Sequence, residues 1–80
     1  MPKLYFHLRE NSEVLLDPEG IDMPENQVPA RALWEARALI AYDAAAGRID
    51  LRPRIDVEDA TGRLVHSLRL ADAIEILRPD

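Results

Sequence analysis

The chain has 80 residues and a formal net charge of -5, with fifteen acidic side chains against ten basic ones. About 48% of its residues are apolar and 31% are charged, which is typical of a folded domain and not of a disordered chain. The absence of cysteine excludes disulfides, thiolate nucleophiles and cysteine-ligated zinc. No apolar run approaches the ~18 residues that cross a bilayer. We therefore expect one domain over residues 1–80, with no secretory signal, no membrane segment and a cytoplasmic location.

The first third of the chain predicts strands. Leu4, Phe6 and Leu8 alternate with more polar residues, a period of two that indicates a half-buried strand. Asn and Ser side chains favour a turn after it, and the segment Asp17–Gly20 contains a proline and a glycine that interrupt regular structure. The expected elements are a strand at 4–9, a turn at 10–12, a returning strand at 14–16, a break at 17–20 and a short strand at 21–23.

The strongest pattern predicts a helix over residues 27–46. Alanine, the best helix former, is the commonest residue in this segment, and nothing from Ala30 to Ala46 interrupts a helix. Asn26 is a suitable N-cap. Gly47 suits the position just beyond the last helical residue.

The last third predicts a second hairpin and completes a two-layer α+β fold, in which one long helix packs on an antiparallel sheet of four to five strands in the order β-β-(β)-α-β-β. A strand around Ile55 and Val57 is followed by a turn at 59–62 and a strand at 64–70, and residues 71–77 form a short helix or an irregular tail. The expected core consists of Val28, Ala32, Ala36, Leu39 and Ile40 against Leu4, Phe6, Leu8, Val14, Leu16, Ile55, Val57, Leu64 and Leu68.

The expected helix has a second apolar face, opposite the one that covers the sheet. It is centred on Trp34, the only tryptophan of the chain. Exposed alanines alone could account for it, since single apolar side chains on a surface are common. Trp, Tyr and Arg are also enriched at interaction hot spots, so the face equally indicates a protein contact, most simply a homodimer. The expected interaction residues are Trp34, Ala30, Ala38, Ala41, Tyr42, Arg31 and Arg37.

No arrangement of residues indicates catalysis, a cofactor or a metal ion. His7 falls on the outward side of the first strand, where we expect solvent. His66 falls in a row with Leu64 and Leu68, which favours a core or rim position over a site residue or a pH switch. The histidine spacing matches no metal motif, so a hydrolytic or metal-dependent activity at His66 is only a minor alternative.

Two charged segments each allow two interpretations. Residues 10–25 contain six carboxylates and no Lys or Arg, which favours a solvated acidic rim over a surface for a basic partner. Arg48, Arg52 and Arg54 alternate with acidic residues, which favours ion pairs over a track for phosphates. We therefore expect no general binding of nucleic acid.

Several short motifs are spread along nearly the whole chain. They are Met1-Pro2-x-x-Tyr5-Phe6-x-Leu8-Arg9, Asp17-x-Glu19-Gly20 with Pro24, and the segments 36–41, 55–59, 61–63 and 72–76. Together they resemble a family of short bacterial proteins, a domain of unknown function common in alphaproteobacteria. The resemblance implies a small α+β fold in a bacterial cytoplasmic protein and supplies no active-site residues. Two positions depart from the pattern: His66, where an aliphatic residue is usual, and the turn at 10–12, where Asp-Gly is usual.

The order of strands and helix also resembles a trimmed HicB-type antitoxin, whose small domain binds a toxin. The leading hypothesis for function is a non-enzymatic interaction module that associates with itself. The alternative is a small regulatory or antitoxin-like protein that binds a basic protein or nucleic acid.

Overall fold

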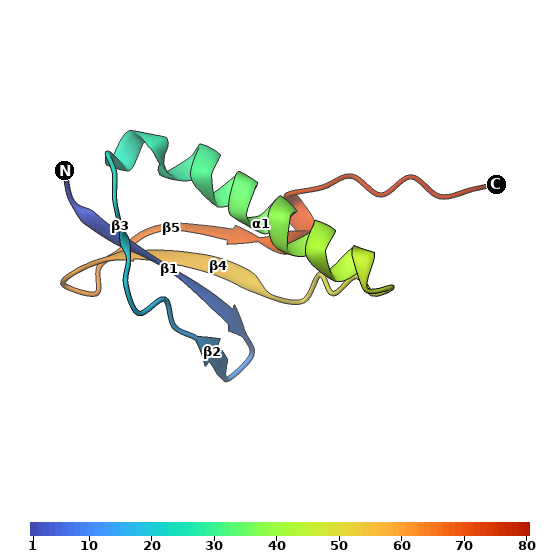
Figure 1. Ribbon diagram of the computed structural model, residues 1–80, viewed down its shortest axis with the longest axis horizontal. Coiled ribbons are helices and arrows are strands. Elements are labelled where there is room, and N and C mark those ends of the chain that lie inside the picture. Colours follow the sequence, from blue (N-terminus) through green and yellow to red (C-terminus); the bar gives the residue numbers. More distant parts are fainter.

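A computed structural model, which describes residues 1–80, has one long helix lying across one face of a five-stranded antiparallel sheet (Figure 1). The strands follow the order β2-β1-β4-β5, and β3 pairs with the beginning of β1. The predicted two-layer α+β fold is confirmed. The elements are β1 (Lys3–Glu10), β2 (Glu13–Leu15), β3 (Ile21–Asp22), the 3-10 turn η1 (Glu25–Gln27), α1 (Val28–Ala45), β4 (Arg54–Asp59), β5 (Leu64–Arg69) and the 3-10 turn η2 (Leu70–Asp72).

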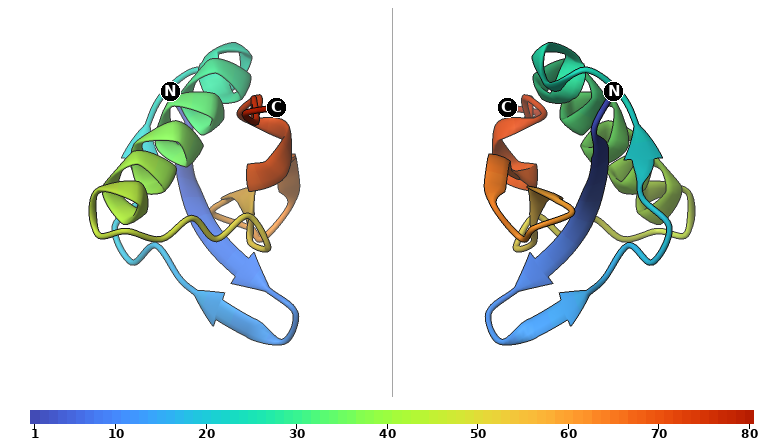
Figure 2. Two further views of the ribbon diagram at one scale, coloured as in Figure 1. Left: turned by 90° about the vertical axis from the view of Figure 1, so that its right-hand side faces the viewer. Right: turned by 90° about the vertical axis from the view of Figure 1, so that its left-hand side faces the viewer.

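The central pair of strands, β1 and β4, gives the sheet two different faces. Phe6 pairs with Val57 on the side that faces α1, and the next pair along, His7 with Asp56, lies on the other side. The end-on views show α1 over one face only (Figure 2). We call the side without a helix the open face of the sheet.

Helix α1 ends as the sequence predicts but begins differently. Gly47 adopts a φ of +91°, its N–H donates to the Ala44 carbonyl, and the Arg48 N–H donates to the Asp43 carbonyl, which is the Schellman pattern. The prediction of Asn26 as N-cap is wrong. Asn26 lies inside η1, and the residue before the helix makes no side-chain capping bond.

The core is built mainly from predicted residues. Seven are buried, namely Leu4, Val28, Ala32, Ala36, Ile40, Ile55 and Val57, and four are half-buried, namely Phe6, Leu8, Leu39 and Leu68. Met23, Leu70 and Ala73 are also buried, because η1 and η2 return the chain to the apolar layer, and the sequence pattern does not identify them.

Three predicted core residues are wrong: Val14, Leu16 and Leu64 are exposed. Val14 pairs with Arg9 and so lies on the open face, while Leu16 follows the end of the edge strand β2. Leu64 leaves the apolar row because the β4–β5 register shifts between Val57 and Glu58. Leu64 therefore pairs with Glu58 on the open face, whereas His66 keeps its place opposite Val57 and is half-buried.

Gly20 passes so close to β1 that a side chain has no room. Its φ is +69°, and an added Cβ would lie 2.8 Å from Tyr5 Cε2 and 2.9 Å from Lys3 Cγ. Gly62, in the β4–β5 turn, has a similar φ of +86° but no atom within 4 Å of the same position.

We expect Gly20→Ala to lower the free energy of unfolding by about 2–3 kcal/mol, because backbone strain and overpacking add together. The control, Gly62→Ala, carries only the backbone strain and should cost about 1 kcal/mol. Urea denaturation of both variants measures the difference. Equal losses would contradict the close approach of Gly20 to β1.

The segment after η2 starts with the buried Ala73 and the half-buried Ile74, and from there it is extended and runs clear of the helix and sheet (Figure 1). It begins at Ala73, whose carbonyl accepts a 2.7 Å hydrogen bond from Arg37 Nε. Of the two alternatives for residues 71–77, a short helix and an irregular tail, the tail is therefore observed. We call residues 74–80 the C-terminal segment.

Candidate interaction surface

The outward face of α1 is apolar along its centre. Trp34 is 60% exposed and Tyr42 79% exposed, although both belong to a helix that packs well on its other side. The alanines around Trp34 are exposed as well. The arc predicted from the sequence therefore points to solvent in the single chain. The outward face of α1 comprises Ala30, Arg31, Trp34, Arg37, Ala38, Ala41 and Tyr42.

The two arginines border this face and are both held in place. Arg31 Cζ lies 4.9 Å from the centroid of the Trp34 ring, a cation–π contact, and Arg31 also forms a 2.9 Å ion pair with Glu35 one turn on. These contacts restrict the Trp34 indole on one side and leave the rest of the ring uncovered. On the other border, Arg37 bonds the Ala73 carbonyl, so its main role is to anchor the chain after η2.

The open face of the sheet carries a polar cluster that the sequence does not predict. His7, expected in solvent, is only 8% exposed, so that expectation is wrong. The reason is that the chain folds back along the free edge of β1, where the Asp17 N–H donates a 3.1 Å hydrogen bond to His7 Nδ1. This bond assigns the proton of the neutral ring to Nε2, which lies 3.6 Å from Glu58 Oε1.

Asp56 is the centre of this cluster and is 6% exposed. The Ser67 hydroxyl donates to it at 2.7 Å and Arg54 Nε at 3.2 Å. Arg9 Nε lies 3.0 Å from Asp56 Oδ2, but its N–H is not directed at that oxygen. The contact is therefore an ion pair without a hydrogen bond. Arg9 also donates a 2.8 Å hydrogen bond from Nη2 to Glu58. The polar cluster is His7, Arg9, Arg54, Asp56, Glu58 and Ser67.

The cluster contains a serine, a histidine and an aspartate on neighbouring strands, but not in the order of a hydrolytic triad. In a triad the histidine lies between the other two and accepts the serine proton. Here Asp56 lies between them, and the Ser67 hydroxyl donates to it. Both ring nitrogens of His7 face other groups, so Ser67 has no imidazole base. The geometry is that of a structural network.

Asp17 fastens the segment between β2 and β3 to β1. Its Oδ2 accepts a hydrogen bond from the Phe6 N–H, and its Oδ1 accepts hydrogen bonds from the N–H groups of Glu19 and Gly20. Partial burial alone would raise the pKa of Asp17. The backbone donors Gly20, Phe6 and Glu19, together with the nearby His7, outweigh burial and lower the pKa below its ordinary 3.8.

Because the pKa of Asp17 is lower in the folded chain than in the unfolded one, the free energy of unfolding decreases as the pH falls. The unfolded chain binds a proton at Asp17 more readily than the folded one, so the stabilisation is complete above about pH 4 and is lost as pH falls through the folded pKa. We expect Asp17→Asn to cost about 1–2 kcal/mol at pH 7, because one oxygen acceptor is lost, and less at about pH 2.5. Urea denaturation across this range tests it. A cost that stays constant or grows in acid would contradict the expectation.

A family model, described as a domain of unknown function (DUF6894), matches residues 3–71. The chain belongs to the DUF6894 family. Searches of curated proteins and of solved structures find no match. The outward face of α1 and the polar cluster both lie within the matched DUF6894 region, and the C-terminal segment lies outside it.

The charged segments of this DUF6894 domain are mostly paired internally. Arg48 and Arg52 both contact Asp50, and the side-chain hydrogen bond from Arg52 holds the pKa of Asp50 far below its ordinary value. Arg54 pairs with Asp56, so all three cations form the expected ion pairs. In the acidic stretch, Glu10 contacts Arg52, Glu25 contacts Arg63 and Asp17 is bonded as described, which leaves Glu13, Glu19 and Asp22 exposed and without an ion pair.

No group of three or more histidine, aspartate or glutamate side chains is placed to hold a metal ion. No helix of the structure has both the length and the apolar character needed to cross a membrane.

Proposed function

We propose that this DUF6894 domain is a non-enzymatic interaction module that forms a homodimer through the outward face of α1. The observation that carries the proposal is the 60% exposure of Trp34, at the centre of a helix face lined by alanines and bordered by arginine and tyrosine. Tryptophan, tyrosine and arginine dominate the energy of protein contacts, and small neighbours allow a partner to approach closely.

The spacing along the helix suits an antiparallel pair of α1 helices. Trp34, Ala38, Ala41 and Ala45 recur at intervals of four, three and four, the seam of a heptad repeat. A two-fold axis near Ala38 would place each Trp34 against Ala41 and Ala45 of the other copy, so that a large side chain meets small ones. The two helix dipoles would then oppose each other, which is favourable.

The test compares Trp34→Glu with a matched control, Leu64→Glu. Leu64 is 55% exposed but lies on the open face of the sheet. Trp34→Glu should lower the mass measured by light scattering from that of the dimer toward that of the monomer and leave the circular dichroism spectrum unchanged, because no core contact is lost. Leu64→Glu should remain dimeric. The proposal fails if both variants keep the wild-type mass.

The alternative is a small regulatory, antitoxin-like protein. One feature favours it, the three exposed and unpaired carboxylates Glu13, Glu19 and Asp22, which would attract a basic protein. A salt series separates the two: contacts with a basic partner or with phosphate weaken steeply as salt rises, whereas an apolar helix contact hardly changes.

The proposal places the module in the bacterial cytoplasm, and support for this comes from the resemblance to short alphaproteobacterial proteins.

A further inference from the structure

An apolar groove of about 200 Å³ runs between α1 and the β1–β2 hairpin. Leu15, which is 70% exposed, forms one wall, and Leu39 of α1 forms the other. The groove exists because α1 lies over β1 and does not extend over β2, so Leu15, on the helix-facing side of β2, has no helix packed on it (Figure 2). The apolar lining residues are Phe6, Leu8, Leu15, Leu39 and Ile55.

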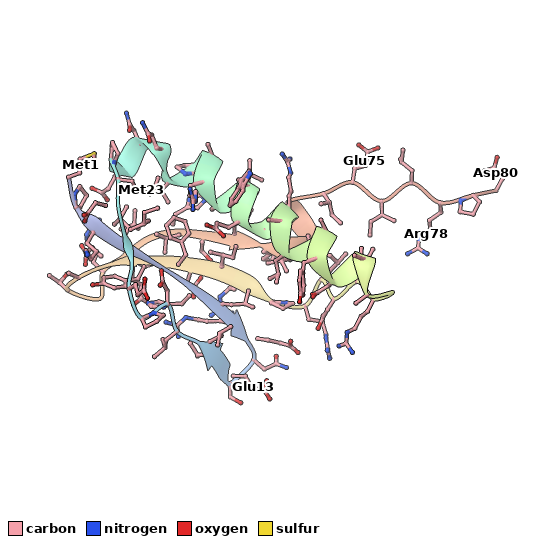
Figure 3. All side chains as sticks on the ribbon, in the orientation of Figure 1. Met1, Glu13, Met23, Glu75, Arg78 and Asp80 are labelled. Carbon is pink, nitrogen blue, oxygen red and sulfur yellow. The ribbon has the colours of Figure 1, made fainter.

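The same chain carries an apolar projection with no packing partner. In the C-terminal segment Ile76 is half-exposed and Leu77 is 82% exposed. Figure 3 shows Glu75, Arg78 and Asp80 projecting from this segment, away from the helix and sheet. An extended segment with adjacent large apolar residues in water is the kind of element that binds in a groove.

The segment cannot fill the groove of its own chain. The Arg37 bond fixes Ala73 on one side of α1, and the groove residues Glu35 and Leu39, each two positions from Arg37, lie on the opposite side at 100° per residue. The path half-way around a helix ~10–12 Å in diameter is ~16–19 Å long. Four extended residues from Ala73 to Leu77 span at most ~14 Å.

We infer that the groove binds the C-terminal segment of a second copy of this chain, with Ile76 and Leu77 against Leu15 and Leu39. Arg78, next to Leu77, is the only cation of a segment that also carries Glu75 and Asp80, and in this arrangement it would face the carboxylates that border the groove at Glu35, and at Glu13 beside Leu15. Reciprocal exchange of the two segments about a two-fold axis closes the assembly at two copies. This contact does not use the outward face of α1 and does not depend on the proposed function.

The test uses the full chain with labelled leucine methyl groups, observed by NMR over a dilution series in the Trp34→Glu background. The Leu15 and Leu39 methyl signals should shift on dilution. The double variant Ile76→Asp/Leu77→Asp should weaken this self-association about tenfold or more, because two apolar side chains lose their buried site. The matched control is Ile49→Asp, an exposed apolar residue outside both groove and segment, which should leave the shifts unchanged.

The inference is overturned if the Leu15 and Leu39 signals do not depend on concentration, or if the double variant behaves like the control. Masses in the wild-type background separate this inference from the proposed function. If Trp34→Glu stays dimeric and Ile76→Asp/Leu77→Asp becomes monomeric, the helix contact fails and the segment exchange stands. The reverse result removes the segment exchange and keeps the helix contact.

Discussion

Replacing Asp56 by alanine should lower the free energy of unfolding by about 2–4 kcal/mol. Asp56 is nearly inaccessible to solvent, and its loss leaves the Ser67 hydroxyl and the guanidinium groups of Arg9 and Arg54 without their shared partner. Breaking a fully buried ion pair costs about 3–5 kcal/mol, and we expect less here because the Arg54 side chain is 46% exposed.

This effect is large for a domain of this size, because its total free energy of unfolding is only about 4–10 kcal/mol. Asp56→Asn keeps the shape of the side chain and one acceptor oxygen, so it should cost less than Asp56→Ala. Ser67→Ala, which removes a single hydrogen bond, should cost about 1 kcal/mol. Urea denaturation followed by circular dichroism measures all three. A loss below about 1 kcal/mol for Asp56→Ala would show that the polar cluster contributes little to stability.

Leu4→Ala should cost about 3–4 kcal/mol, because it opens a cavity in the centre of the core. Leu4 is 1% exposed and lies in β1 between β3 and β4. Leu64→Ala is the matched control. It should change stability by less than about 0.5 kcal/mol, since the register shift places Leu64 in solvent. Equal losses of stability in the two variants would mean that Leu64 is buried in the core, and would contradict the observed register.

The sequence predicts those features that depend on a single element. The alternation from Leu4 to Leu8 identifies β1, and Gly47 marks the end of α1. The exposure of Trp34 follows from the same local logic, because 100° per residue fixes its direction once the opposite face of the helix packs on the sheet.

Features that depend on contacts between distant segments are not predicted. His7 is buried because Asp17, ten residues on, folds back along β1. Leu64 leaves the core through a register shift that only the pairing with β4 reveals. The groove at Leu15 depends on where α1 crosses the sheet, and no periodicity in the sequence encodes that position.

The helix contact alone would form a weak dimer. An 18-residue helix is ~27 Å long and ~10 Å wide, so its outward face offers ~270 Å² per copy. Standard protein interfaces bury ~800 Å² per partner. A contact of this size needs high protein concentration.

Sedimentation equilibrium of the wild-type protein, from about 10 µM to about 1 mM, tests self-association most directly. The proposed helix contact predicts a mass that rises from 9.1 kDa toward twice that value, and Trp34→Glu, which keeps only the exchange of C-terminal segments, should stay below the wild-type mass at each concentration. A wild-type mass of 9.1 kDa at every concentration would contradict it.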